Sequence, residues 1–287
     1  MAGVNAPAPP DPRDRPIGVF DSGVGGLTVL HELLVALPAE DFIYLGDTAR
    51  FPYGERSREE LERFSVELAE ELLRARTKLI VVACNAATAA GLPALQRRMM
   101  ETTLGVEVIG VVTPEAQHAV ELTRNGRIGL LATPATVAAE AYDRAVRAAD
   151  ERVELFSVAC PDLAPIIQGG FPFDERVVAT VRGYVEPLRE ARVDTVILGC
   201  THYPLVSPML QRMLGRDVRI ATSGAAVARR VEQTLSLREL ATRRTGEGDY
   251  RFLSTGDPAS FRDLGTHFLQ MPLGDVRRVD VRQATAA

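Results

Sequence analysis

Apolar residues occur in short continuous runs that alternate with amphipathic stretches along almost the whole chain. The runs LIVVAC, VIGVV, IGLLA and VILGC are typical of strands covered on both faces, because no polar position interrupts them. This alternation predicts an α/β fold with mostly parallel sheets flanked by helices. The predicted strands are Pro16–Phe20, Phe42–Gly46, Leu79–Cys84, Val106–Val112, Arg127–Ala132, Val153–Ala159, Thr195–Gly199 and Val218–Ala221.

Several of the intervening helices have recognisable start signals. Ser57, followed three residues later by Glu60, predicts a capping box ahead of an amphipathic helix that reaches Arg76. Elsewhere a capping side chain precedes a proline, a residue that favours the first helical position. These pairs are Thr113-Pro114, Thr133-Pro134 and Asp257-Pro258.

The number of strand–helix units predicts two domains, because so many units exceed what one compact core usually holds. The segments VVACNAATA and VILGCTHYP resemble each other, since each joins a buried strand to a cysteine and a helix start. We therefore expect two pseudo-symmetric domains that face each other across a cleft. The predicted division is a disordered leader (1–15), a discontinuous first domain (16–110 plus 222–280), a second domain (111–221) and a tail (281–287).

The composition excludes several classes of protein. The chain has 287 residues, 46% apolar, with 33 basic against 38 acidic side chains and a net charge of −5. This balance argues against a nucleic-acid partner, because binding to phosphates needs clustered cations. The mostly apolar stretch from Leu79 to Leu92 is shorter than the roughly 20 residues of a membrane span.

The cysteines and histidines predict a protein of a reducing compartment that holds no metal ion. The three cysteines lie far apart with no C-x-x-C pair, which predicts free thiols in a cytoplasmic protein. Four histidines without paired ligand spacing predict no bound metal.

In parallel sheets, ligands bind beyond the carboxyl ends of the strands. Polar residues stand at this place after two of the predicted strands. The first strand leads into Asp21-Ser22-Gly23-Val24-Gly25-Gly26, whose glycines leave backbone N–H groups free to hold an anion. The alternative is a tight turn that needs glycine for its backbone conformation. The second strand leads into Gly46-Asp47-Thr48 and then Pro52-Tyr53-Gly54 at the same sheet edge.

Two cysteines stand at strand ends beside helix starts, in Cys84-Asn85 and Cys200-Thr201-His202. A helix N-terminus stabilises a thiolate, so we expect the pKa of both thiols to be lowered. The alternative is a cysteine that serves only as a small buried apolar residue, which we retain for Cys160. His202 lies two residues beyond Cys200, close enough to direct the proton of that thiol.

Two opposed thiols suit the inversion of a carbon centre, which needs a base on one face and an acid on the other. The usual alternative for amino acids is pyridoxal phosphate, which requires a lysine Schiff base. Lys78 is the sole lysine and precedes the strand that leads to Cys84, about 20 Å away at ~3.3 Å per residue. We therefore predict a reaction without a cofactor.

The chain resembles the glutamate racemases of the cofactor-independent aspartate/glutamate racemase family. The resemblance rests on IGVFDSGVGGLTVL, YLGDTARFPYG, VVACNAATA, GVVTP, RIGLLATPAT, VDTVILGCTHYPL and STGDPASF, in this order. It implies two α/β domains with the active site between them, and interconversion of L- and D-glutamate for peptidoglycan synthesis. Relatives are commonly dimers, which makes a homodimer an expectation.

The resemblance also implies roles for individual residues. Cys84 and Cys200 correspond to the two acid/base thiols, with Asp21 assisting the first, His202 assisting the second, and Asp47 as a further supporting acid. The residues expected around the substrate are Asp21, Ser22, Tyr53, Gly54, Asn85, Ala86, Thr201 and His202.

Two positions depart from the family pattern. Ala86 stands where the family usually has threonine or serine, which removes one hydroxyl contact to the substrate carboxylate. Gln168 stands where the family often has a glutamate that supports the second thiol. An amide orients its neighbour but exchanges no proton, so the two directions of turnover are predicted to differ.

Three other functions fit parts of the pattern. An aspartate racemase of the same family differs in substrate, and the CTH triplet favours glutamate. A cysteine hydrolase needs only the Cys200/His202 pair, which leaves Cys84 dispensable, and it forms an acyl-enzyme that can be trapped. A non-catalytic amino-acid-binding module keeps the cleft, but the presence of both thiols argues against it.

Overall fold

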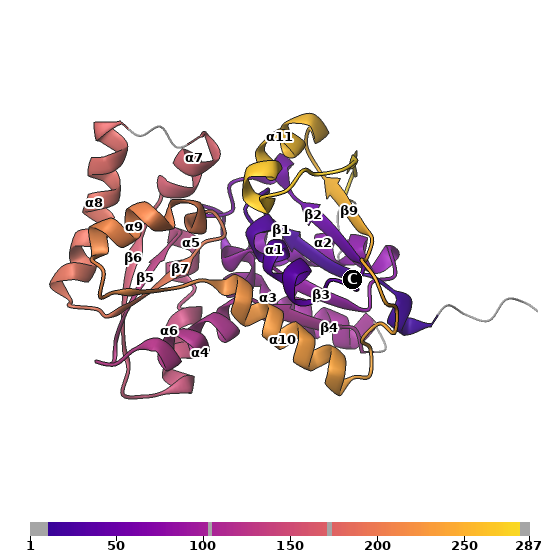
Figure 1. Ribbon diagram of the computed structural model, residues 1–287, viewed down its shortest axis with the longest axis horizontal. Coiled ribbons are helices and arrows are strands. Elements are labelled where there is room, and N and C mark those ends of the chain that lie inside the picture. Colours follow the sequence, from indigo (N-terminus) through magenta and orange to yellow (C-terminus); the bar gives the residue numbers. More distant parts are fainter. Residues whose placement is uncertain (1–10, 103–104, 171–173, 282–287) are drawn as a thin grey trace, which may run out of the picture.

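The computed structural model describes residues 11–102, 105–170 and 174–281. Within them the chain forms two parallel sheets that lie beside each other, with helices packed on both (Figure 1). The larger sheet has the order β10-β9-β2-β1-β3-β4, and the smaller has the order β6-β5-β7-β8. The predicted α/β fold with parallel sheets is therefore confirmed.

The larger sheet takes strands from both ends of the described chain. Its strands are β1 Ile17–Asp21, β2 Phe42–Gly46, β3 Leu79–Val82, β4 Glu107–Gly110, β9 Tyr250–Ser254 and β10 Val276–Arg278. The helices packed around it are α1 Leu27–Ala36, α2 Arg58–Arg74, α3 Asn85–Thr102, α10 Ser223–Leu237 and α11 Pro258–Leu269. α2 packs against α3, and α1 packs between α10 and α11.

The alternating direction of side chains along each strand explains why helices cover both faces of the larger sheet. In β1, Ile17 and Val19 pack in the same cluster as the α1 residues, whereas Phe20 packs with Leu61 and Leu68 of α2. Successive side chains of a strand point to opposite faces, so a continuous apolar run is buried on both.

The smaller sheet is built from the middle of the chain. Its strands are β5 Arg127–Ala132, β6 Glu154–Ala159, β7 Thr195–Gly199 and β8 Arg219–Ala221. Its helices are α4 Val112–Leu122, α5 Pro134–Ala138, α6 Ala141–Ala149, α7 Leu163–Gln168, α8 Glu175–Glu190 and α9 Ser207–Leu214. Short 3₁₀ helices, η1 Pro12–Asp14, η2 Thr48–Arg50 and η3 Tyr203–Val206, complete the described structure.

The two sheets share one strand order. β2-β1-β3-β4 in the larger sheet corresponds to β6-β5-β7-β8 in the smaller, strand for strand along the chain. β3 leads to Cys84 and β7 leads to Cys200, so the two cysteines follow equivalent strands. This agreement supports the expected pseudo-symmetry, while the domain boundaries themselves stay a prediction.

All eight predicted strands are present, three of them with the predicted ends (β2, β5 and β7). Strands β9 and β10 were not predicted, because β9 alternates buried with half-exposed residues and β10 is a three-residue strand at the sheet edge. Of the predicted leader and tail, residues 1–10 and 282–287 lie outside the described residues, and Pro12–Asp14 form η1 instead of a disordered segment.

The predicted helix starts are correct in three places and wrong in one. The capping box of Ser57 and Glu60 opens α2, which ends at Arg74, and the pairs at Thr133 and Asp257 precede α5 and α11. Thr113 is not a cap, because β4 ends at Gly110 and the chain enters α4 directly at Val112.

Lys78 lies before β3, at the end of the sheet opposite Cys84, as predicted. Its side chain is buried and donates hydrogen bonds to Glu40 Oε2 (2.5 Å), the Arg13 carbonyl (2.6 Å) and the Leu240 carbonyl (2.9 Å). The sole lysine therefore ties the first sheet to two distant segments. Among the described residues, the helices are all too short or too polar to cross a membrane.

Candidate active site

A narrow cleft lies where the carboxyl ends of β1 and β3 face those of β5 and β7. Both Cys84 and Cys200 line it, which brings together two residues separated by more than a hundred positions in the chain. The other expected site residues that line the cleft are Ser22, Tyr53, Gly54, Asn85, Ala86, Thr201 and His202.

Cys84 is held in a buried position two residues after β3. The backbone N–H of Ala87 donates to its Sγ atom over 3.5 Å, and Ser22 also bonds to it. Burial is the largest influence, followed by the neighbouring Asp21 carboxylate, and together they raise the pKa of Cys84 to about 12. The predicted lowering of this pKa is therefore wrong for the ligand-free protein, because burial outweighs the N–H groups at the helix start.

Asp21 lies beneath the cleft and is fully buried. Its carboxylate accepts hydrogen bonds from the backbone N–H groups of Gly23 (3.1 Å) and Gly26 (3.0 Å), and from the Thr201 hydroxyl (3.4 Å). Burial raises the pKa of Asp21, while these N–H groups and the Cys84 thiol lower it. Two N–H groups of the glycine-rich loop thus point at the protein's own Asp21 side chain, whereas the expected role of the loop was to hold an anion as ligand.

The glycines of this loop are required by close packing. A Cβ atom on Gly26 would lie 2.6 Å from the Asp21 Cβ atom, and one on Gly25 would lie 2.4 Å from the Thr201 hydroxyl. The loop therefore brings the first sheet into direct contact with the segment after Cys200.

Cys200 directly follows β7 and is also buried. Burial raises its pKa well above the ordinary value, and the backbone N–H of His202 opposes that shift only partly. Cys84 and Asp21 are further groups that raise the pKa of Cys200. The predicted lowering of the pKa is wrong for this thiol as well.

His202 connects Cys200 to Gln168, one of the two residues that depart from the family pattern. Its Nδ1 atom lies 3.8 Å from Cys200 Sγ, and its Nε2 atom lies 2.9 Å from Gln168 Oε1. An amide oxygen only accepts, so Nε2 carries the hydrogen and Nδ1 is left as an acceptor for the thiol proton. Burial lowers the pKa of His202 to about 4, which keeps the ring neutral near pH 7.

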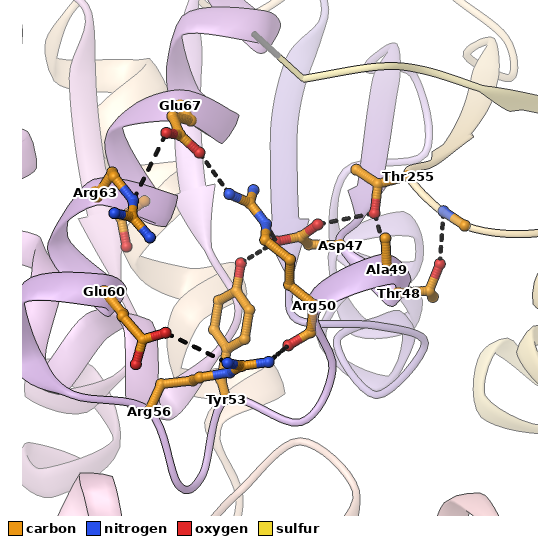
Figure 2. A network of polar contacts seen from close by, with 12 residues as sticks. Asp47, Thr48, Ala49, Arg50, Tyr53, Arg56, Glu60, Arg63, Glu67 and Thr255 are labelled. Carbon is orange, nitrogen blue, oxygen red and sulfur yellow. Dashed lines mark hydrogen bonds and ion pairs between the residues drawn. The ribbon is translucent and has the colours of Figure 1, made fainter. Parts of the chain in front are cut away.

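Tyr53 reaches the cleft from a polar network on the first sheet (Figure 2). Its hydroxyl donates to Asp47, which also accepts from Arg50 Nε (2.5 Å) and the Thr255 hydroxyl (2.8 Å). Arg50 donates in turn to Glu67 over 2.5 Å. Asp47 therefore orients Tyr53 from behind and does not line the cleft, and its expected role as a supporting acid stays a prediction.

Among the described residues, the cleft lining contains one carboxylate side chain, that of Glu55. Within the part of the chain that the structure describes, no arginine or lysine lines the cleft. Hydroxyl and N–H donors are available instead from Ser22, Thr133, Thr136 and Thr201. These donors suit a small polar ligand that is bound by hydrogen bonds.

Comparison with known proteins decides the family. The sequence pattern of the Asp/Glu/hydantoin racemases matches residues 17–231. The chain belongs to this racemase family. A glutamate racemase of Geobacter metallireducens is 43% identical over 267 residues, covering 93% of this chain and 97% of the relative. One from Bacillus cereus is 38% identical over 266 residues, covering 93% and 97%.

Solved structures of the racemase family have the same architecture. The glutamate racemase isoform RacE1 of Bacillus anthracis superposes with a TM-score of 0.88 at 37% identity, covering 94% of this chain and 98% of the other. The Francisella tularensis glutamate racemase in complex with D-glutamate has a TM-score of 0.86 at 32% identity, with the same coverage. An aspartate racemase of Picrophilus torridus, at 16% identity and a TM-score of 0.55, shares the fold alone.

Of the residues expected around the substrate of this racemase-family chain, Asp21 lies outside the cleft lining. Asp21 contacts Cys84 from below the cleft, and its expected contact with the substrate stays a prediction. Ala86 lines the cleft with a methyl group, as its sequence indicates.

The sequence did not identify the two cleft residues that follow β5 of the smaller sheet. Thr133 and Thr136 line the cleft, with their hydroxyl oxygens 3.0 Å apart. Thr133 follows β5, the equivalent of β1, so the strand-end rule that identified Asp21 applies to it equally. A Cβ atom on Gly54 would lie 2.9 Å from Thr133, which shows how closely the two sheets approach here.

Proposed function

We propose that this protein interconverts L- and D-glutamate without a cofactor, using Cys84 and Cys200 as its two acid/base groups. The observation that carries the proposal is that these thiols follow equivalent strands of two sheets and line one cleft. The relatives named glutamate racemase, at 38–43% identity over most of the chain, support glutamate as the substrate.

The reaction needs one thiolate and one thiol at the same time. The thiolate removes the Cα proton from one face, and the thiol on the opposite face gives its proton to the resulting carbanion. The protonation states are exchanged after each turnover, so the reverse reaction uses the same groups in opposite roles. The Asp21 carboxylate accepts from the Cys84 thiol, and His202 Nδ1 faces the Cys200 thiol, so each thiol has an acceptor for its proton.

The location and purpose of the reaction follow from the same proposal. Free thiols are typical of proteins in the reducing cytoplasm, so we place the reaction there. The D-glutamate that it forms would supply peptidoglycan synthesis. A homodimer is the expected assembly, as for its relatives.

The test is turnover of D-glutamate in D₂O, followed by circular dichroism and mass spectrometry. Racemised glutamate is expected to carry one deuterium at Cα, because the returned proton comes from a thiol that exchanges with solvent. Aspartate, in a parallel reaction, is expected to turn over far more slowly. Racemisation without deuterium, or no racemisation of glutamate, contradicts the proposal, and preferred turnover of aspartate supports the aspartate racemase instead.

Replacement of Gln168 by glutamate is expected to change kcat by several-fold, and differently for the two enantiomers. A carboxylate beside Nε2 stabilises the protonated ring, so the pKa of His202 rises from about 4 and its basicity toward Cys200 increases. The equilibrium constant of racemisation is one, so kcat/KM stays equal in both directions and any asymmetry appears in kcat and KM separately. Separate kcat measurements from L- and D-glutamate test this, and equal changes in both directions contradict it.

A further inference from the structure

A cluster of three buried polar side chains lies directly behind the cleft. Asn85, the first residue of α3, lines the cleft, and Glu115 of α4 and Tyr142 of α6 contact it from the second sheet's side. All three are at most 2% exposed. The expected family pattern did not include Glu115 or Tyr142, and neither lines the cleft.

The hydrogen bonds in this cluster fix the orientation of the Asn85 amide. Its Nδ2 group donates to the Tyr142 hydroxyl over 2.7 Å and to Glu115 Oε2 over 3.3 Å. The Tyr142 hydroxyl donates to the same carboxylate oxygen. The two acceptors lie next to each other on one side of the amide, so the Nδ2 group faces the cluster.

The Asn85 carbonyl oxygen is left without a partner. Its Oδ1 atom is buried and makes no hydrogen bond to any residue that the structure describes. A buried acceptor without a donor costs free energy, and a ligand donor relieves that cost. Since the amide nitrogen points into the cluster, the oxygen is the group that Asn85 offers to a ligand.

The chemistry of glutamate identifies the donor. At neutral pH its two carboxylates only accept hydrogen bonds, and its ammonium group only donates them. The described cleft lining contains no lysine or arginine that would bind to Oδ1 in its place.

We propose that Glu115 and Tyr142 are positioning residues that hold the Asn85 amide with Oδ1 toward the cleft, where it binds the substrate's α-ammonium group. This inference rests on the proposed function and adds the group of the substrate that Asn85 recognises. Because the ammonium is bound in both the ground state and the transition state, loss of this contact raises KM and changes kcat little.

The experiment compares glutamate with glutarate, which has both carboxylates and no ammonium group. Binding of each is measured by calorimetry, and kcat and KM are measured for D-glutamate. Tyr142→Phe and Glu115→Leu are expected to weaken glutamate binding and raise KM about tenfold, as for the loss of one hydrogen bond to a charged group. Glutarate affinity is expected to change less than twofold.

Glu115→Gln is the conservative variant, because its amide oxygen still accepts from Asn85 and Tyr142. It is expected to bind glutamate within about threefold of the wild type. Tyr184→Phe is the matched control, since it removes a tyrosine–carboxylate hydrogen bond to Asp162 (2.6 Å) outside the cleft lining. It is expected to leave both affinities and KM unchanged.

Glutamate and glutarate affinities that fall together in Tyr142→Phe would overturn the inference, since the variant would then disturb the cleft as a whole. A Glu115→Gln variant as weak as Glu115→Leu would also overturn it. Failure of the proposed function looks different, because the wild-type protein itself would then neither bind nor racemise glutamate, and both proposals would be rejected.

Discussion

Replacement of either Cys84 or Cys200 by serine lowers the rate of glutamate racemisation by at least about a thousandfold. Serine keeps the shape of cysteine, but its hydroxyl is a much weaker acid than a thiol, so it neither removes nor returns the Cα proton efficiently. Every turnover requires both transfers, one on each face of the substrate. Each single replacement is therefore expected to stop both directions, and kcat/KM falls equally from L- and D-glutamate.

Cys160 provides the matched control for this experiment. It is the third buried free cysteine, and its thiol lies 3.6 Å from the backbone carbonyl of Val158. Since Cys160 is absent from the cleft lining, Cys160→Ser is expected to keep kcat within about threefold of the wild type. Racemisation within tenfold of the wild type in either Cys84→Ser or Cys200→Ser would contradict the two-thiol mechanism. Activity lost only on replacement of Cys200 favours the cysteine hydrolase.

The protein without substrate is expected to resist alkylation of Cys84 by iodoacetamide at neutral pH. Only the thiolate reacts, and burial together with the Asp21 carboxylate raises the pKa of Cys84 to about 12. The thiolate fraction at pH 8 is therefore about one in ten thousand. It rises about tenfold with each pH unit, which gives about a thousandfold increase in rate between pH 7 and pH 10.

The measurement is the rate of carbamidomethylation of Cys84, followed by mass spectrometry of its peptide across this pH range. Glutathione is the control, because its rate levels off once the pH passes the ordinary thiol pKa of about 8.5. A Cys84 rate that levels off near pH 7 would show a lowered pKa and contradict the expectation. With a raised value in the free protein, we expect the bound substrate's ammonium charge to lower the pKa of Cys84.

The fold was predictable from the sequence where the apolar pattern is unambiguous. β2, β5 and β7 contain continuous apolar runs that begin directly after a polar residue, and their predicted ends are correct. β9 was missed because its half-exposed positions give no continuous run, and it becomes a strand through pairing with β2. That pairing joins segments about 200 residues apart, which a local pattern does not reveal.

The candidate site was predictable where a single strand end carries the chemistry. Cys84, Cys200 and His202 were identified from short motifs, and the structure brings them to one cleft. The direction of the thiol pKa shifts was not predictable, because it depends on burial by the opposite sheet. Glu115 and Tyr142 act on Asn85 from other helices, so no motif around Asn85 indicated them.

The buried position of Lys78 has a practical consequence for chemical labelling. Its amine is the only one that any side chain of this protein supplies, and all three of its N–H donors are already bonded. Acylating reagents therefore find no reactive side-chain amine on the folded molecule. Modification of Lys78 reports that the surrounding structure has opened, which makes this residue a built-in probe for native-state unfolding.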